Sequence, residues 1–189
     1  MPQTESAQAA YATSEEPIRP AQRPWTSLNS LQLGRLAEYH VTMALVRAGL
    51  DVYTPAIDDR GIDLVARLGP GRYLEIQVKA TRGFNYVFMR KNVFAIDPFR
   101  YLAYVLFVGE LEPIVYLLPS TLWRAPSNLF ISRDYEGKKS PPEYGLSVTK
   151  ANRHLLERFR LDAVLSEILA DLQQGRSPSP RRLGLGSPM

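Results

Sequence analysis

One stretch of the sequence, residues 61–81, constrains the fold more than any other because it predicts a β-hairpin. Its first half contains GIDLVAR and its second half LEIQVKA, both suited to short strands, and the LGPGR between them has the composition of a tight turn. A strand carries successive side chains on opposite faces. One face of the second strand is therefore apolar, and the other consists of Glu75, Gln77 and Lys79.

Three polar side chains in a row are costly to bury unless something binds to them. The first strand of the predicted hairpin carries one acid, Asp63, between apolar neighbours. The hairpin can bring Asp63 alongside Gln77 and Lys79, which predicts a site for binding a metal ion and activating a nucleophile. The alternative is an ordinary two-stranded ribbon with one wet face, on which Asp63 and Lys79 form a surface ion pair.

The composition limits the chemistry of such a site. The chain has no cysteine, which excludes disulfides, thiolate zinc sites and cysteine nucleophiles. Its only histidines are His40 and His154, too few for a histidine-rich metal site and a poor basis for a Ser-His-Asp triad. Any metal would be held by oxygen ligands, which favours Mg²⁺ or Mn²⁺.

Length and charge suggest one domain with a tail at each end. A chain of 189 residues that is 45% hydrophobic can bury a real core. The net charge of +4 and the pI near 9.4 fit a nucleic-acid partner, but residues 174–189 alone carry three arginines and no acid. The charge alone therefore does not decide the partner. Neither a long apolar run nor a signal-peptide pattern is present, so we expect a soluble, cytoplasmic protein without a membrane partner.

The composition also divides the chain. Residues 1–28 are rich in Ala, Gln, Pro, Ser and Thr and are predicted to be a disordered tail, in which only Trp25 is expected to dock on the body. Residues 29–173 are predicted to form the folded domain. Residues 174–189, rich in Ser, Pro and Arg, are predicted to be a second disordered tail.

The folded domain is predicted to begin and end with a helix. The first runs from Asn29 or Ser30 to about Ala48, with apolar residues at helical spacing. Glu38 lies beside its apolar face, either as an ordinary boundary glutamate or pointing at the acidic site of the hairpin. Gly34, one turn earlier, would allow close backbone approach. The last helix is predicted from Thr149 or Asn152 to about Leu172.

Strands fill most of the space between these helices. Besides the hairpin, the apolar patterns predict strands at 51–57, 85–89, 101–109 and 114–118. A brief helical turn through Trp123 follows, with Ser120 as its expected cap. Residues 125–149 are predicted to be irregular. Lys138 and Lys139 lie there in an exposed loop, where either phosphate contact or solubility would explain them.

Basic and aromatic residues interleave just after the hairpin, a mixture that suits phosphate contact and base stacking. An equally good interpretation is a solvated loop beside core aromatic residues. The candidate nucleic-acid contacts are Arg82, Tyr86, Arg90 and Lys91.

Three motifs in this order resemble the PD-(D/E)XK nuclease superfamily: GRLAE at 34–38, GID at 61–63 and EIQVK at 75–79. The closest resemblance is to the branch of archaeal Holliday-junction resolvases and a group I intron-encoded homing endonuclease. It covers residues 29–81 well and the remainder loosely. It implies an α/β fold with a restriction-endonuclease-like αβββαβ core, in which helices flank a mixed sheet, and the activity of a metal-dependent DNA endonuclease.

The resemblance also implies roles for individual residues. Asp63 would be the metal-binding aspartate, Lys79 the catalytic lysine and Glu38 the helix glutamate that completes the metal site, with the Val78 carbonyl as a neutral ligand. Glu75 would either contact the metal ligands without binding the metal itself or form a salt bridge with an arginine, and we favour the first role. The implied catalytic set is Glu38, Asp63, Gln77 and Lys79, and the implied metal ligands are Glu38, Asp63, Gln77 and Val78.

Two positions depart from the pattern of the superfamily. Ile62 replaces the proline of its name, and Gln77 stands where most members have Glu or Asp, which removes a charge from the metal site. We therefore keep two alternatives to the endonuclease: a catalytically weak or inactive nuclease-fold module that binds nucleic acid or protein, and a structural protein whose polar strand face is merely solvated. For the endonuclease the expected partner is DNA, and a homodimer is expected if both strands are cut.

Overall fold

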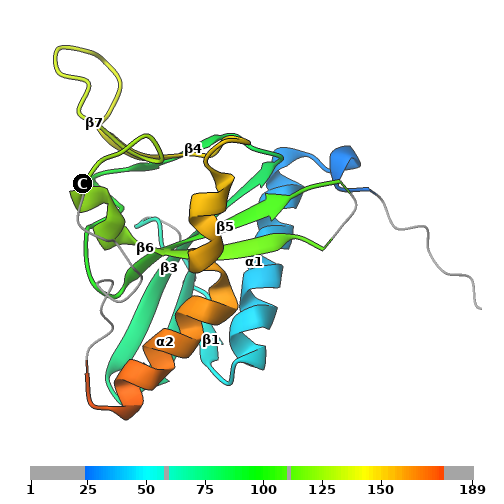
Figure 1. The fold of residues 1–189 in the computed structure, drawn as a ribbon, viewed down its shortest axis with the longest axis vertical. Helices are drawn as coiled ribbons and strands as arrows, with labels where there is room; N and C mark the ends of the chain where they lie inside the picture. Colours follow the sequence, from blue (N-terminus) through cyan, green and yellow to red (C-terminus); the bar gives the residue numbers. More distant parts are fainter. Residues whose placement is uncertain (1–23, 58–59, 110–111, 177–189) are drawn as a thin grey trace, which may run out of the picture.

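The computed structural model describes residues 24–57, 60–109 and 112–176, which build two β-sheets and the helices that cover them (Figure 1). In chain order the elements are the 3₁₀ helix η1 (Trp25–Ser27), α1 (Ser30–Arg47), β1 (Asp51–Tyr53), β2 (Leu64–Gly69), β3 (Arg72–Arg82), β4 (Tyr86–Arg90), β5 (Arg100–Phe107), β6 (Ile114–Pro119), the 3₁₀ helix η2 (Ser120–Arg124), β7 (Phe130–Arg133), β8 (Glu143–Ser147), the 3₁₀ helix η3 (Arg153–Phe159) and α2 (Leu161–Gln173).

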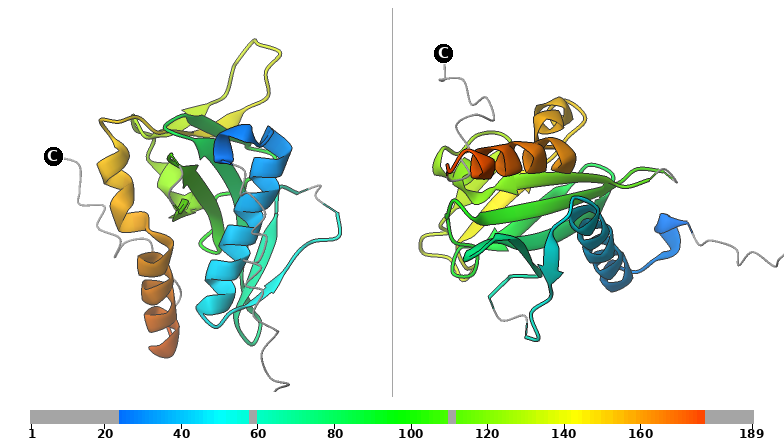
Figure 2. Two further views of the ribbon diagram at one scale, coloured as in Figure 1. Left: turned by 90° about the vertical axis from the view of Figure 1, so that its right-hand side faces the viewer. Right: turned by 90° about the horizontal axis from the view of Figure 1, so that it is seen from below.

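The larger sheet has the strand order β1-β2-β3-β5-β6, in which β3 and β5 are parallel and the other neighbours antiparallel. α1 lies on one face of this sheet and α2 on the other, as the right-hand view of Figure 2 shows. All eight residues of β5 are buried, as expected for a central strand covered on both faces. The prediction of a mixed sheet flanked by helices is confirmed.

Helix α1 begins where the sequence predicts because both halves of a capping box are present. The Asn29 side chain accepts from the Gln32 N–H and the Gln32 side chain accepts from the Asn29 N–H, each at 2.9 Å. Every fourth residue of the helix faces the sheet: Leu33, Ala37, Val41 and Leu45 are buried. The close backbone approach expected at Gly34 is not found, because a Cβ there would meet no atom within 4 Å.

The predicted hairpin is present as β2 and β3. Gly69 pairs with Arg72, so the loop is the two residues Pro70 and Gly71, and the positive φ of Gly71 (69°) suits the turn. The first strand starts later than predicted, at Leu64, because Gly61 turns the chain with a φ of 61°. The strand predicted at 51–57 is also shorter and ends at Tyr53, before Pro55, which cannot donate a ladder hydrogen bond.

The expectation that residues 125–149 are irregular is wrong. They contain β7 and β8, which join β4 in a three-stranded antiparallel sheet of order β4-β8-β7. The same sheet explains a difference from the αβββαβ order: the connection between the parallel strands β3 and β5 contains β4 and a turn in place of a helix. β7 has only four residues and β8 contains Gly145, so neither shows a clear strand pattern in the sequence.

Two smaller expectations are also corrected. The predicted last helix is two helices, η3 and α2, because Arg160 between them has extended backbone angles and forms an isolated bridge with Tyr116 of β6. Ser120 does not cap the turn that follows β6. Its hydroxyl accepts from the Asp97 N–H and donates to the Asp97 carbonyl, at 2.8 and 2.9 Å.

The described part of the N-terminal segment docks as expected. The Trp25 ring packs edge-on against Phe107, with ring centroids 5.3 Å apart. Residues 1–23 and 177–189, where most of the two predicted tails fall, lie outside the described residues. Among the residues that the structure does describe, no helix combines the length and apolarity needed to cross a bilayer.

Candidate active site

Asp63 reaches β3 from its position just before β2. Its Oδ2 accepts a hydrogen bond of 2.5 Å from the Val78 N–H, and its own N–H donates to the Ile76 carbonyl at 2.9 Å. The Asp63 carboxylate thus accepts the Val78 N–H, which a backbone carbonyl would accept if β2 began earlier. Since Leu64 pairs with Ile76, continuing the register by one residue places Asp63 beside Gln77. The hairpin therefore brings these two predicted residues together.

The Val78 carbonyl points toward the same edge of β3 as the Asp63 carboxylate. In a strand the N–H and C=O of one residue face the same neighbour, and the Val78 N–H faces Asp63. The backbone groups of alternate residues of β3, which are Glu75, Gln77 and Lys79, face β5 instead. The bond from the Glu75 N–H to the Phe99 carbonyl shows this direction. A neutral carbonyl ligand next to Asp63 is thus compatible with the backbone.

Gln77 carries an unpaired oxygen in a buried place. The residue is 6% exposed, and its Oε1 accepts no hydrogen bond from the described residues. Its amide nitrogen lies against Gly61, where an added Cβ would be only 2.8 Å away. A buried, unsatisfied acceptor costs about 1–3 kcal/mol, a cost that a cation or a water bound to the oxygen would relieve.

Lys79 lies on the same face of β3 as Gln77, two residues further along. It is half-buried and is the register partner of Tyr104 on β5. Within the described part of the chain its ammonium group makes no hydrogen bond or ion pair. This cation is therefore available to an anionic group that approaches Gln77 and Asp63.

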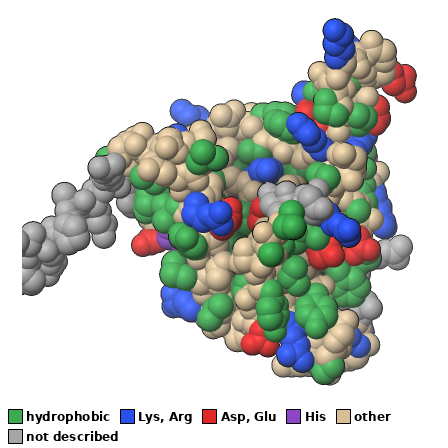
Figure 3. Space-filling view, turned by 180° about the vertical axis from the view of Figure 1, so that it is seen from behind, with side chains coloured by type: hydrophobic (Ala, Val, Ile, Leu, Met, Phe, Trp, Pro, Cys, Tyr) green, Lys and Arg blue, Asp and Glu red, His purple; other side chains and the backbone are tan. Residues whose placement is uncertain are grey.

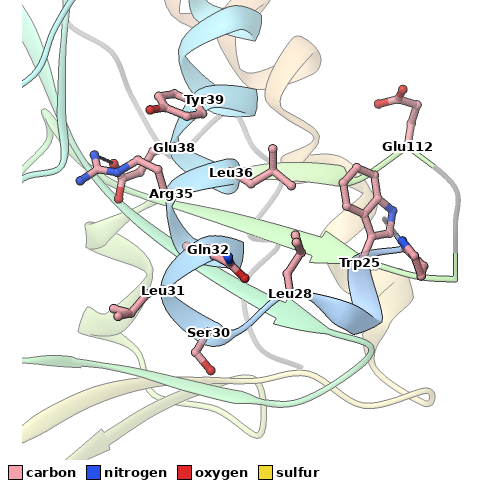
Figure 4. Close-up of a pocket in the computed structure, with 12 residues that line it drawn as sticks. Trp25, Leu28, Ser30, Leu31, Gln32, Arg35, Leu36, Glu38, Tyr39 and Glu112 are labelled. Carbon is pink, nitrogen blue, oxygen red and sulfur yellow. Dashed lines mark hydrogen bonds and ion pairs between the residues drawn. The ribbon is translucent and has the colours of Figure 1, made fainter. Parts of the chain in front are cut away.

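Glu38 is held on the surface of α1, the helix that packs against β3. Its Oε2 lies 2.5 Å from Nη1 of Arg35, one turn earlier. Figure 4 shows both side chains extending from one side of α1, away from Trp25 and Glu112. To serve as a metal ligand, Glu38 would have to share or release Arg35.

Glu75 pairs with a buried arginine, the second of the two roles considered for it. Nη1 of Arg100, a residue 4% exposed, lies 2.7 Å from the Glu75 carboxylate. Its Nη2 donates to the carbonyls of Arg60, Gly61 and Val93. Arg100 thus ties β5 to the segment that leads into Asp63.

Sequence reasoning missed Arg100 because the predicted strand begins one residue later, at Tyr101. The signal that could have found it is a charged residue at the edge of a long apolar run, which must be paired if it is buried. Gly61 was noticed only as part of a motif. Its contact with Gln77 depends on the tertiary fold.

The four candidate nucleic-acid contacts have different surroundings. Arg82 donates to the carbonyls of Trp25 and Leu28, and Lys91 pairs with Asp134 at 2.6 Å. The Tyr86 hydroxyl donates to Glu143 at 2.5 Å, and burial together with this bond raises the pKa of Tyr86. Arg90 is exposed, and its guanidinium forms no ion pair or hydrogen bond with a described residue.

A groove of about 1060 Å³ runs along the N-terminal half of α1 (Figure 4). Trp25 and Leu28 line one side, and Arg35 and Glu38 are among the lining residues, but Asp63, Gln77 and Lys79 are not. On the face of the molecule drawn in Figure 3, basic and acidic side chains are interspersed rather than gathered by sign. Neither feature enlarges the candidate site.

The oxygen donors suit a hard divalent cation, which so few charged ligands would bind with low affinity. The Asp63 carboxylate, the Gln77 amide oxygen and the Val78 carbonyl are all oxygen donors, the type that Mg²⁺ and Mn²⁺ prefer, and the Gln77 oxygen is unpaired. The described residues hold no group of three or more His, Cys, Asp or Glu side chains suited to a metal. A metal ion bound here would therefore depend on neutral donors beside one or two carboxylates.

Two of the solved structures that align with this chain are covered over most of their own length. A bacterial homing endonuclease aligns with a TM-score of 0.47 and 20% identity, over 78% of this chain and 97% of its own. The Holliday junction resolvase of the archaeal hyperthermophile Archaeoglobus fulgidus aligns with a TM-score of 0.40 and 17% identity, over 65% of this chain and 88% of its own. No protein-family model and no curated protein matches the sequence.

Proposed function

We propose that this chain is a metal-dependent DNA endonuclease that hydrolyses phosphodiester bonds. The observation that carries the proposal is the convergence of Asp63 with the edge of β3 at Val78, next to the buried, unpaired Oε1 of Gln77. The Gln77 oxygen has no role in stabilising the hairpin, since an apolar residue at this position would avoid an unsatisfied acceptor.

Mg²⁺ or Mn²⁺ would be held by Asp63, Gln77 and the Val78 carbonyl, with Glu38 completing the set. Such an ion acts as a Lewis acid on the phosphoryl oxygens and lowers the pKa of a bound water. The protein fixes the ligands in advance: the Val78 N–H orients the Asp63 carboxylate, and Gly61 leaves room for the Gln77 amide.

Lys79 would act on the substrate directly. Its ammonium group is on the same strand face as Gln77 and lacks a described partner, so it can donate hydrogen bonds to the attacking water and to a phosphoryl oxygen. Negative charge grows on those oxygens in the transition state, and a fixed cation stabilises it. Arg100 would act indirectly, because its bonds to the Arg60 and Gly61 carbonyls hold the segment that precedes Asp63.

Two observations favour the alternative of a weak or inactive binding module. Gln77 contributes no charge to the site, and Glu38 is already paired with Arg35 at 2.5 Å. The third hypothesis, a merely solvated strand face, is not favoured, because Gln77 is buried and its neighbour Val78 bonds to Asp63.

Cleavage and metal titration distinguish the first two functions. The purified chain is incubated with supercoiled, linear and branched DNA and Mg²⁺ or Mn²⁺, beside Asp63→Ala, Lys79→Ala and the surface control Glu167→Ala. We expect cutting by the wild type and the control, and losses of about 100-fold or more in the two site variants. Cutting that persists in both site variants would assign the activity to another site or a contaminant.

A calorimetric titration with Mn²⁺ completes the test. Binding that is lost in Asp63→Ala supports the metal site independently of any cutting. If the chain neither binds Mn²⁺ nor cuts any of the three DNAs, the inactive binding module is the correct alternative.

A further inference from the structure

The hairpin formed by β7 and β8 projects from the rest of the molecule. In Figure 1 the connection between these strands extends beyond the smaller sheet, and the left-hand view of Figure 2 shows the same projection. The connection comprises residues 134–142. A loop of this length contributes nothing to the core, so its position has to be explained by solubility or by contact with a partner.

The base of the hairpin is firmly held. The Glu143 carboxylate is buried and accepts from the hydroxyl groups of Tyr86 and Tyr135, at 2.5 and 2.8 Å. Lys91 adds two links: its N–H donates to the Pro142 carbonyl at 3.0 Å and its ammonium pairs with Asp134 at 2.6 Å. The hairpin is thus attached to the end of β4 through both of its limbs.

The tip presents two lysines in a defined turn. The Lys138 N–H donates to the Tyr135 carbonyl at 2.8 Å, and Gly137 supplies the positive φ (71°) that the turn requires. Lys138 and Lys139 follow, both exposed and without a partner among the described residues. The connection contains two acids. Asp134 is paired with Lys91, and Glu136 is exposed.

A continuous path joins this hairpin to the candidate active site. Val93 lies beside Gly61 and Gln77, since a Cβ on Gly61 would be 3.2 Å from it. The Val93 N–H donates to the carbonyl of Arg90 at 3.1 Å, and Arg90 pairs in register with Glu143 at the base of the hairpin. The backbone of Arg90 therefore lies between the segment beside the site and the base of the hairpin.

We propose that the β7–β8 hairpin binds the phosphate backbone of the duplex whose scissile bond enters the site, through Lys138 and Lys139 at its tip and Arg90 at its base. The inference rests on the proposed function for the position of the DNA. Exposed lysines on a fixed projection suit contacts with phosphates, which position a duplex without reading its sequence. The turn fixes the backbone from which both cations extend, which limits the backbone entropy lost on binding.

The test uses a labelled linear duplex of arbitrary sequence in EDTA, so that binding is measured without cutting. Fluorescence anisotropy gives the Kd over a range of salt concentrations for the wild type and for Lys138→Ala/Lys139→Ala. The control is Arg47→Ala/Arg72→Ala, which removes the same charge from exposed positions at the end of α1 and at the β2–β3 turn.

We expect the hairpin variant to bind about tenfold more weakly, and the slope of log K against log salt to fall by about 1.8, or about 0.9 for each lost phosphate contact. The control should match the wild type. Glu136→Gln should bind more tightly than the wild type, an effect that a merely structural role of the hairpin would not produce.

The outcomes separate this inference from the proposed function. Wild-type affinity and slope in the hairpin variant, in a protein that cuts DNA, would overturn the hairpin contact and leave the endonuclease standing. A wild type that binds the duplex through the hairpin but cuts nothing would remove the endonuclease alone. An equal loss in the control variant would reduce the effect to net charge and overturn the hairpin contact.

Discussion

At the scale of single residues, the candidate site depends on Gln77 and on the glycine that makes room for it. A glutamate at this position would add a charge for a metal, but with no metal bound it would bury an unpaired carboxylate. Compared with glutamate, glutamine would lower both the affinity for a metal ion and the free-energy cost of burying the side chain without one. Glycine is required at position 61 for two reasons. Its φ of 61° is unfavourable for other residues, and a Cβ there would lie only 2.8 Å from the Gln77 amide nitrogen.

Gln77→Glu should exchange stability for metal affinity. Without a divalent ion we expect a lower melting temperature than in the wild type, because a carboxylate replaces a neutral amide in a buried place. Added Mg²⁺ should then raise the melting temperature by more than in the wild type, since each tenfold gain in affinity adds about 1.4 kcal/mol to the unfolding free energy. Differential scanning fluorimetry across a Mg²⁺ series measures both effects.

Gln174→Glu, an exposed change of the same chemistry after α2, is the control and should respond to Mg²⁺ as the wild type does. An equal Mg²⁺ response in Gln77→Glu and the wild type would remove Gln77 from the ligand set.

Gly61→Ala tests the contact with Gln77 against a matched glycine. Gly71 has a similar φ of 69°, but a Cβ there would meet no atom within 4 Å. Both alanine variants should lose about 1–2 kcal/mol from the backbone conformation, as measured by urea unfolding. Only Gly61→Ala should also displace Gln77, and with it lower Mn²⁺ affinity. Equal Mn²⁺ affinity in the two variants would show that the Gln77 position is not needed for binding.

At the scale of elements, the smaller sheet depends on close packing between two strands. The Tyr86 ring of β4 lies over Gly145 of β8, and the Arg133 guanidinium lies 5.0 Å from the centre of the same ring. The Tyr86 hydroxyl then reaches Glu143. One tyrosine thus joins β4 to β8 and to the base of the hairpin, and a side chain at Gly145 would displace it.

Gly145→Ala should therefore destabilise the smaller sheet by about 1–3 kcal/mol, the usual cost of overpacking. Gly34→Ala is the matched change in open space on α1, and it should stabilise the protein by about 0.5–1 kcal/mol because alanine favours a helix. Denaturant unfolding gives both values. The two variants shifting in the same direction would contradict the packing described for Tyr86 and Gly145.

At the scale of the whole molecule, buried tyrosines link stability to alkaline pH. Burial is the main cause that raises the pKa of Tyr101, Tyr104 and Tyr116, and for Tyr116 burial and the hydrogen bond to Glu157 raise the pKa to about 12. In the unfolded chain a tyrosine ionises near 10. Between these values the folded protein keeps a proton that the unfolded chain has lost.

The unfolding free energy should consequently be at its full value below pH 10 and decrease as the pH rises from 10 to about 12. Urea unfolding across this range measures the decrease. Tyr116→Phe should show a smaller decrease than the wild type, whereas the exposed control Tyr39→Phe should follow the wild type. A decrease of the same size in Tyr116→Phe would exclude Tyr116 as a source of the pH dependence.

The sequence by itself determined the features that depend on neighbouring residues. The helix start at Asn29 or Ser30, the turn within residues 68–72 and the alternating face of Glu75, Gln77 and Lys79 are set by interactions a few residues apart, and all were predicted. The mixed sheet flanked by helices was expected from the resemblance of three motifs to the PD-(D/E)XK superfamily. The site roles given to Glu38, Asp63, Gln77, Val78 and Lys79 remain predictions.

Tertiary structure alone decided which side chains are paired and which remain unpaired. Arg100 pairs with Glu75 and Tyr86 bonds to Glu143, while Gln77 keeps an unpaired oxygen. β7 and β8 are strands because β4, far earlier in the chain, supplies their partner. Contacts over such separations depend on how the whole chain packs, and no local period or spacing in the sequence encodes them.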